Sequence, residues 1–305
     1  MPRVAYFGPE GTFTEAALLQ MVAAGLVPGG GHVDEVSCDS PAATLSAVRT
    51  DDADYACVPI ENSIDGSVLP TLDSLSAGAP LQIYAEYTLD VAFSIVVRPG
   101  TEPASVETVA AFPVAAAQVR HWLAGNLAKA ELVPANSNAA AARDVADGRA
   151  DAAVSTALAA ERWGLATLAA GVVDESNART RFVLVGRPGA PPAPTGADRT
   201  SVVLRLDNVP GALVAALTEF AVRDIDLTRI ESRPTRVELG TYLFFVDCFG
   251  HIADDPVAEA LKALYRRCKD VRYLGSWPTG SAVAGTPPAT DEATRWLNGL
   301  LEGIS

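Results

Sequence analysis

Histidine is scarce in this chain of 305 residues, which has only His32, His121 and His251, far apart and without metal-ligand spacing. So few imidazoles disfavour a histidine-based metal centre or a Ser/His triad. The four cysteines form no C-x-x-C pair, and a chain of this length needs no disulfide staples. Because the N-terminus lacks a signal peptide and no apolar run of about 18 residues occurs, we expect a cytoplasmic protein.

Positive charge is also in short supply. Lys and Arg number 23 against 37 Asp and Glu, which gives a formal net charge of −14. Such a chain repels polyanions, so nucleic acid and anionic membranes are not expected as partners. A small anionic substrate is still allowed, because a local group of backbone N–H donors and an arginine can override the global field.

The composition is that of a globular protein, with 49% hydrophobic and 20% charged residues. The length predicts two or three compact units. In the first part, strands at 4–7 and 55–60 flank two helices, one with Thr12 and Glu15 as a capping box and one starting at Ser40-Pro41. This alternation indicates an α/β layer with a largely parallel sheet.

The pattern changes after residue 81. Two strand-like runs come first, and helices and strands then alternate. The predicted strands are 82–89, 91–97, near 132, 150–154 and 181–186. The predicted helices are 114–123, 137–148 and 156–163. We interpret the region as two α/β lobes, residues 1–80 with 176–187 and residues 81–175. Two connections between lobes make a hinge, and ligands commonly bind in the cleft beside it.

A Pro/Gly-rich linker at 188–199 separates these lobes from a smaller module at 200–278. The module has the βαββαβ order of ferredoxin-like folds. Its predicted strands are 201–206, 227–234, 241–248 and 271–277, and its predicted helices are 210–223 and 256–268. The tail, 279–305, has a Pro/Gly/Thr stretch at 279–290 and then an amphipathic segment with Trp296, Leu297, Leu300 and Leu301.

Polar residues gather at three places in the lobes. Gly11 and Thr12 lie in a glycine turn at a helix start, which suits an anion but also an ordinary turn. Glu61, Asn62 and Ser63 follow a buried strand, the usual ligand edge of an α/β sheet. A third group stands at the start of a late strand: Thr180, flanked by Arg179 and Arg181 and followed by Phe182.

An arginine can grip a substrate carboxylate in bidentate fashion, but a basic cluster at a strand edge can also simply be solvated. In the module, 208–213 and 231–234 could capture the carboxylate and ammonium of an amino acid, although both also suit plain capping. The chain has no G-x-S-x-G, H-E-x-x-H or G-x-x-x-x-G-K motif, so no cofactor is called for.

Together these segments resemble the prephenate dehydratase family, from about Val4 to Trp277. The resemblance rests on Gly8-Pro-Glu-Gly-Thr-Phe-Thr-Glu15, Val58-Pro-Ile-Glu-Asn-Ser63 and Thr180-Arg-Phe182, and on an ACT-type module with Gly211-Ala-Leu213 and Glu231-Ser-Arg-Pro234. It implies a catalytic region of two lobes like periplasmic-type binding proteins and a C-terminal ACT domain. It also implies a lyase of phenylalanine biosynthesis that turns prephenate into phenylpyruvate without a cofactor.

The resemblance further assigns residues. Thr180, Glu61, Asn62 and Gln118 are implied as catalytic, and Gly11, Thr12, Ser63, Arg181 and Phe182 as substrate-binding. L-phenylalanine, and other aromatic amino acids with it, would bind allosterically at the ACT domain, through Asn208, Gly211, Ala212, Leu213, Glu231, Ser232, Arg233 and Pro234. The family implies a homodimer through this domain, within a homotetramer.

The chain also departs from the family. Where relatives have Ser-His-Pro-Gln, it has Ala111-Phe-Pro-Val114, and where they have an asparagine two positions before the threonine, it has Ala178, with Asn177 one residue away. Thr180 could donate a hydrogen bond to the departing hydroxyl, or Glu61 could be the acid. Two further alternatives are an arogenate dehydratase and a non-enzymatic amino-acid sensor.

Overall fold

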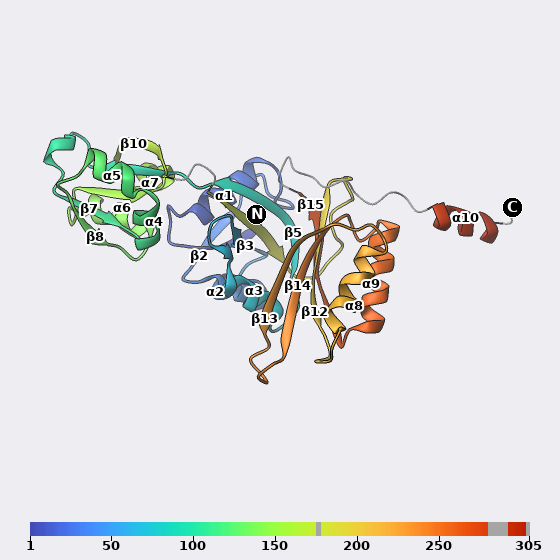
Figure 1. Cartoon of the computed structure of the whole chain (residues 1–305). Helices are drawn as coiled ribbons and strands as arrows, with labels where there is room; N and C mark the ends of the chain where they lie inside the picture. The colour runs from blue at the N-terminus through green and yellow to red at the C-terminus, as the bar shows by residue number, and fades with distance from the viewer. Residues whose placement is uncertain (175–177, 280–291, 303–305) are drawn as a thin grey trace. The chain divides into compact units, whose positions relative to one another are not determined.

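The computed structural model describes residues 1–174, 178–279 and 292–302 (Figure 1). Asn177 and residues 280–290 of the Pro/Gly/Thr stretch lie outside the described residues. The chain forms two compact units. The first unit consists of Met1–Thr71 and Tyr87–Val183, and the second of Leu72–Glu86 and the chain from Leu184 onward. The short segment Leu72–Glu86 therefore belongs physically with the C-terminal part of the chain.

The first sheet contains both predicted polar strand ends. Its order is β2 (Asp34–Cys38), β1 (Arg3–Phe7), β3 (Tyr55–Asn62), β11 (Arg179–Gly186) and β5 (Gln82–Asp90), with β4 (Gly66–Ser67) paired to β3. β1 is parallel to β2 and β3. As predicted, Thr12 caps α1 (Phe13–Ala23) and Ser40 caps α2 (Pro41–Arg49), each through its side-chain oxygen. The late strand β11 returns to this sheet beside β3, which brings residues 61–63 and 179–181 together.

Sequence patterns missed several elements of the first unit. These are β2, α3 (Leu69–Ser76), β7 (Thr108–Ala111), β10 (Ala166–Val172) and a 3-10 turn at Pro103–Ser105. β2 is largely solvent-exposed, so it does not present the apolar run that reveals a buried strand. β5 pairs in the first sheet, whereas the sequence grouped residues 82–89 with the second lobe.

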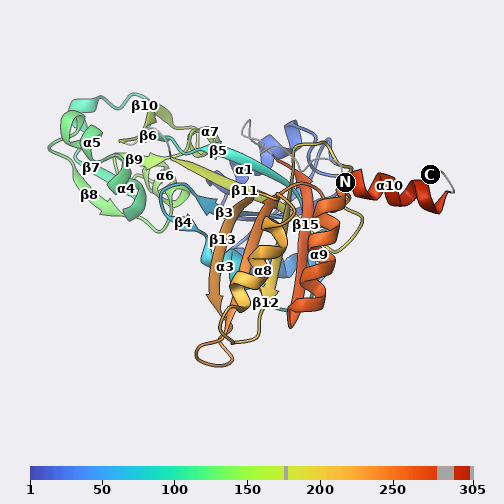
Figure 2. The same cartoon turned by 45° about the vertical axis from the view of Figure 1, so that its right-hand side comes forward.

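The second sheet has the order β10, β6 (Phe93–Val97), β9 (Ala152–Ser155), β7 and β8 (Glu131–Pro134). The helices α4 to α7 gather around it (Figure 2). Two of them, α6 (Asn138–Ala146) and α7 (Ala157–Arg162), begin where the sequence predicted, after Ser137 and Thr156.

The predicted helix 114–123 is divided into α4 (Pro113–Gln118) and α5 (Arg120–Asn126). At Val119 the backbone turns to φ −124°, and its side chain is fully buried. Asp174 satisfies both sides of the break, because its N–H donates to the Gln118 carbonyl and its carboxylate accepts from the His121 N–H. The interruption thus leaves these two groups paired.

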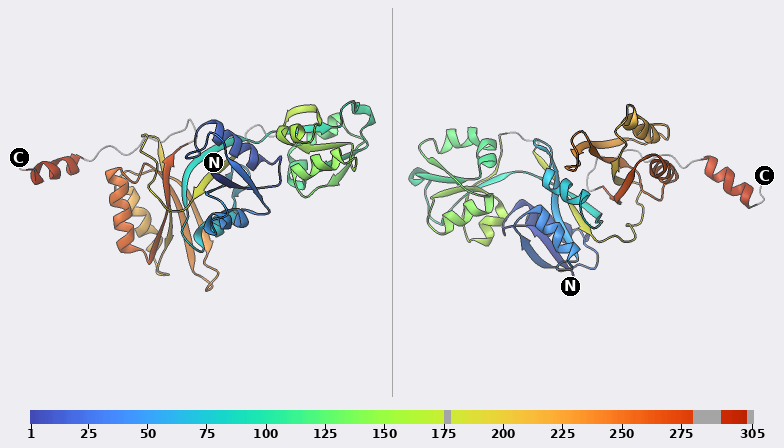
Figure 3. Two further views of the ribbon diagram at one scale, coloured as in Figure 1. Left: turned by 180° about the vertical axis from the view of Figure 1, so that it is seen from behind. Right: turned by 90° about the horizontal axis from the view of Figure 1, so that it is seen from below.

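The second unit contains the predicted βαββαβ module. The antiparallel sheet runs β13 (Leu227–Pro234), β14 (Tyr242–Phe249), β12 (Asp198–Arg205) and β15 (Asp270–Pro278). The helices α8 (Ala212–Ala221) and α9 (Asp255–Arg267) lie side by side on one of its faces (Figures 2 and 3). The ferredoxin-like prediction is confirmed. The amphipathic tail segment forms α10 (Glu292–Leu301).

The segment Leu72–Glu86 contacts this module closely. A Cβ at Gly275 would lie 2.4 Å from the carbonyl oxygen of Ile83, so only glycine lets β15 approach so near. The indole of Trp277 donates to the Glu86 carboxylate at 3.0 Å.

Across the described residues no helix is long and apolar enough to cross a membrane.

Candidate functional site

Thr180 lies at the start of β11 and has Asn62, at the end of β3, as its partner. The Asn62 amide Nδ2 donates to the Thr180 hydroxyl oxygen at 2.9 Å. Asn62 Oδ1 accepts from the N–H groups of Ile64 and Asp65 at 2.8 and 3.0 Å, which fixes the end of the amide that faces Thr180. Because the Thr180 oxygen accepts this bond, its own proton is left to be donated elsewhere.

Ser63 fixes the two strand ends to each other. Its N–H donates to the Arg179 carbonyl at 2.8 Å, and its hydroxyl accepts from the Arg179 N–H at 2.9 Å. The guanidinium of Arg179 pairs with Asp90 at 2.8 Å, in the open. Ser63 and Arg179 thus set the register in which Asn62 meets Thr180.

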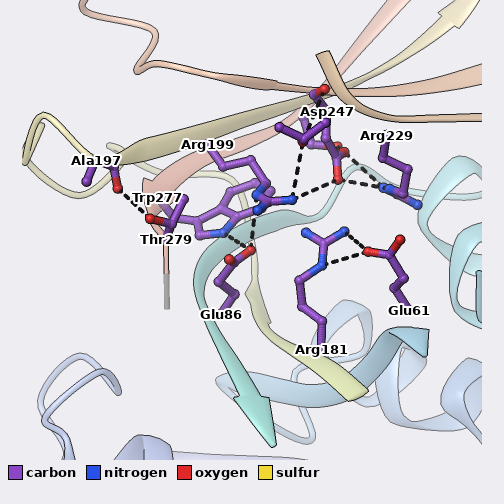
Figure 4. A network of polar contacts seen from close by, with 11 residues as sticks. Glu61, Glu86, Arg181, Ala197, Arg199, Arg229, Asp247, Trp277 and Thr279 are labelled. Carbon is purple, nitrogen blue, oxygen red and sulfur yellow. Dashed lines mark hydrogen bonds and ion pairs between the residues drawn. The ribbon is translucent and has the colours of Figure 1, made fainter. Parts of the chain in front are cut away.

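Glu61 and Arg181 form an ion pair on the other face of the sheet. Arg181 Nη2 and Nε lie 2.8 and 3.1 Å from Glu61 Oε2, and Figure 4 shows the two groups pointing toward each other. Successive side chains of a strand leave opposite faces, so this pair and the Asn62–Thr180 pair are separated by the sheet. Phe182 shares the face of Thr180 and is buried.

A cavity of about 460 Å³ lies at the loop that follows Asn62. Its wall includes Ile64 and Asp65, which hold the Asn62 amide, and Gln118 from α4. Gln118 Oε1 is buried and has no hydrogen-bond partner in the described part of the chain. An unpaired buried acceptor is costly, so it is suited to a donor group of a ligand. The cavity is therefore lined by one predicted catalytic residue, Gln118, and by the two residues that hold the amide of another, Asn62.

The glycine turn is held by protein groups. The Gly11 N–H donates to the Glu15 carboxylate, and the Gly11 carbonyl accepts from Thr156 Oγ1 at 2.6 Å. Thr12 Oγ1 donates to the Phe7 carbonyl at 3.2 Å and accepts from the Glu15 N–H. The capping box differs from the expected one, because Glu15 reaches Gly11 rather than the cap residue itself.

A second cavity, of about 220 Å³, lies in the module. Asn208, Gly211, Ala212 and Leu213 line it, as do the aromatic rings of Tyr242 and Phe244. Four of the residues predicted to bind an effector thus surround one space. The cavity is mainly apolar with a helix start at one side, which suits a small molecule with an apolar body and an anionic end.

The other four predicted effector residues are divided between the faces of β13. Ser232 and Pro234 pair in register with Phe244 and Tyr242, two residues of the cavity wall. By alternation, Glu231 and Arg233 leave the opposite face. There Arg233 makes a bidentate pair with Asp73, at 3.0 Å through Nε and 3.0 Å through Nη2. The structure therefore places Ser232 and Pro234 near the cavity and Arg233 away from it.

Sequence patterns missed the buried charges of the second unit. Arg229 pairs with Asp247 at 2.9 Å, and Arg199 lies 3.4 Å from Glu86 (Figure 4). These side chains are buried, so each charge requires a partner. The partners are far apart in the chain and no motif marks them. The one available signal was arginine in otherwise apolar strands.

Comparison with known families places both parts of the chain in described families. The family model of prephenate dehydratase matches residues 4–190, and that of the ACT domain matches residues 200–264. A prephenate dehydratase of Mycolicibacterium smegmatis is 75% identical over 307 residues, which cover 99% of each chain. One from Mycobacterium tuberculosis is 72% identical, over 99% of this chain and 95% of its own.

Two solved structures are similar to this chain over most of its length. A prephenate dehydratase from Arthrobacter aurescens in complex with L-Phe has a TM-score of 0.86 and 39% identity, and it covers 99% of this chain and 100% of its own. GqqA, described as a quorum-quenching acylase, has a TM-score of 0.80 and 31% identity, over 90% of this chain and 97% of its own. The two family matches also follow each other along the chain in the order predicted from the sequence. The chain therefore belongs to the prephenate dehydratase family and carries a C-terminal ACT domain.

Proposed function

We propose that the chain converts prephenate to phenylpyruvate at the Asn62–Thr180 pair, with Thr180 as hydrogen-bond donor to the departing hydroxyl. The observation that carries the proposal is the direction of the Asn62–Thr180 hydrogen bond. Asn62 donates, so the threonine O–H is left to point at the substrate. Glu61, the alternative acid, accepts both donors of Arg181 on the other face of the sheet.

The reaction breaks two bonds of the substrate. The ring carboxylate leaves as carbon dioxide, its electron pair enters the ring, and the ring C–O bond breaks. The hydroxide takes up one proton and leaves as water. Aromatisation drives the change, so the protein has to stabilise the negative charge that develops on the leaving oxygen. A hydrogen bond from Thr180 meets this need, and a site closed to water strengthens it.

The substrate is a dianion, whereas the chain as a whole carries −14. We propose that it enters the cavity beside Gln118, where Arg120 supplies positive charge next to the carboxylates of Asp65 and Asp174. Gln118 would orient it, through its buried Oε1, by accepting a substrate O–H. Ser63 joins the two strand ends around Thr180 through Arg179. The part of Gly11, Thr12, Arg181 and Phe182 in substrate binding stays a prediction. The lobes would be residues 1–80 with 176–187 and residues 81–175, and they would close over this cavity.

The activity is tested by offering the purified protein prephenate and arogenate separately and following phenylpyruvate and phenylalanine. We expect turnover of prephenate at a kcat/KM at least tenfold above that for arogenate. Preference for arogenate would show that the chain is an arogenate dehydratase. No turnover of either compound would contradict an enzyme and favour a non-enzymatic amino-acid sensor.

We further propose that L-phenylalanine binds the cavity lined by Asn208 and 211–213 and inhibits turnover. The A. aurescens relative was solved with L-Phe, and the cavity combines a helix start with two aromatic rings. In this proposal N–H groups at the start of α8 receive the carboxylate and the rings contact the phenyl group.

A second copy of the chain would complete this site. Ser232 and Pro234 lie on an exposed edge strand, beside the apolar Ile230, which is 48% exposed. Val209 and Val214, at the start of α8, are 60% and 69% exposed. Such an apolar surface on a sheet edge suits pairing of two modules. We therefore propose a homodimer through the ACT domain, within a tetramer.

Gly211→Ala should weaken phenylalanine binding at least tenfold, as measured by calorimetry. Gly211 has φ +83°, a backbone conformation that alanine adopts only with strain, so the start of α8 would shift at the cavity wall. Gly196→Ala is the matched control, because Gly196 has the same φ of +83° and equally open surroundings but lies in the linker. Equal affinities of the two variants would refute this location of the effector site.

A further inference from the structure

The loop 8–12 is joined to α7 by several close contacts. Thr156 Oγ1, at the cap of α7, donates to the Gly11 carbonyl at 2.6 Å. A Cβ at Gly11 would lie 2.9 Å from the Cβ of Ala159, so glycine allows the loop to lie directly on the helix. α1, which follows the loop, packs on the first sheet, whereas α7 packs on the second. The contact therefore bridges the two sheets of the catalytic unit.

Arg162, the last residue of α7, adds a charge to this bridge. Its Nη2 pairs with Oε1 of Glu15, while Oε2 of the same carboxylate accepts the Gly11 N–H. The Glu15 side chain is completely buried, and that of Arg162 is 40% exposed. A buried carboxylate without a cationic partner is strongly unfavourable, so Glu15 depends on Arg162.

Glu35, on β2, increases this dependence. Its carboxylate lies 3.8 Å from Arg162 Nη2, and burial together with the charge of Glu15 raises the pKa of Glu35. Arg162, on a helix of the second sheet, thus faces one carboxylate of the first sheet, Glu35, and one of the helix that packs on that sheet, Glu15. If the two sheets moved apart, both carboxylates would lose this guanidinium, and Gly11 would lose Thr156.

We propose that Arg162 is a positioning residue for the dehydration, and that it holds the second sheet and its helices against the 8–12 loop in the arrangement used for turnover. The inference rests on the proposed reaction and lobes. Arg162 touches no reacting atom in this scheme. It acts through Glu15 and Gly11, so that Gln118, on α4 beside the second sheet, and Thr180, on β11 of the first sheet, are held at the same substrate.

Arg162→Ala should reduce kcat/KM for prephenate by about 10²-fold, the usual scale of an ångström-sized misplacement. Arg162→Lys keeps the charge and should recover at least tenfold of that loss. Glu15→Gln should add little once Arg162 is alanine, because both changes break one contact. Arg149→Ala is the control, since Arg149 forms ion pairs with Asp144 and Asp147 on the surface of the same unit.

Hydrogen exchange gives a reading that does not depend on activity. In Arg162→Ala the amides of residues 11–15 and of α7 should exchange at least tenfold faster, while β9 and α6 stay as in the wild type. Unchanged exchange and unchanged kcat/KM, or faster exchange throughout the second sheet, would overturn the proposal. Wild-type turnover in the same assay separates this outcome from failure of the proposed reaction, which would show as no turnover in any variant.

Discussion

Thr180→Ala should lower kcat for prephenate by about 10²–10⁴-fold, the range attributed to one positioned proton or hydrogen-bond donor. KM should change little, because in the proposed mechanism the hydroxyl acts on the leaving group as charge develops and not on the bound ground state. Thr180 is 9% exposed and the substitution removes few atoms, so melting temperature and phenylalanine binding should stay near the wild-type values.

Two variants sharpen this result. Thr180→Ser keeps the hydroxyl and should retain kcat within about tenfold. Asn62→Asp should be nearly as inactive as Thr180→Ala, because a carboxylate can only accept and would draw the threonine proton away from the substrate. Steady-state kinetics with prephenate measures all three. Full activity of Thr180→Ala would move the acid role to Glu61, and Glu61→Gln would then be the inactive variant.

Much of this site could be predicted because its residues follow strands. A buried apolar run that ends in polar residues is visible at Glu61–Ser63, and a polar group that opens an apolar run is visible at Thr180–Phe182. That β11 lies beside β3 was partly foreseen, as a strand returning to the first lobe. The module was predicted in element order because each of its strands and helices carries its own periodic pattern.

The pairing of side chains could not be predicted in the same way. Sequence proximity suggested that Thr180 and Arg181 act on one substrate, but adjacent strand residues face opposite sides of the sheet. The partner of Arg233 is Asp73, 160 positions away, and neither residue lies in a pattern that indicates the other. The break at Val119 depends on Asp174, which sits beyond three intervening strands. Contacts of this kind are created by the tertiary fold alone.

Asp73 connects α3 with β13, the strand that carries part of the proposed effector site. It lies in α3, and its carboxylate accepts two hydrogen bonds from Arg233, the residue between Ser232 and Pro234. Arg272, from β15, donates to the carbonyls of Leu75, Ala77 and Gly78 at the end of the same helix. At the other end, Thr71 Oγ1 donates to the carbonyl of Pro59 in β3 at 2.7 Å.

A ligand that moves Ser232 and Pro234 would therefore pull α3 through Arg233, and α3 begins directly after the loop that holds Asn62. A displacement of that loop would change the bond from Asn62 to Thr180 and lower turnover, which is how we expect phenylalanine to inhibit. In this mechanism binding and inhibition are separable, because the cavity and the Asp73–Arg233 pair lie on opposite faces of β13.

Asp73→Asn should accordingly raise the phenylalanine concentration needed for half-inhibition by at least tenfold. The amide offers one acceptor in place of a charged bidentate partner, so it cannot hold Arg233 as the carboxylate does. Calorimetry should give a phenylalanine Kd within about threefold of the wild type, and kcat without effector should stay within twofold. Glu259→Gln, which removes an exposed pair with Lys262 in the same unit, should leave inhibition intact. If Asp73→Asn remains fully inhibited, or loses inhibition only by losing phenylalanine, the signal takes another route, and Arg272 at the end of α3 becomes the next residue to change.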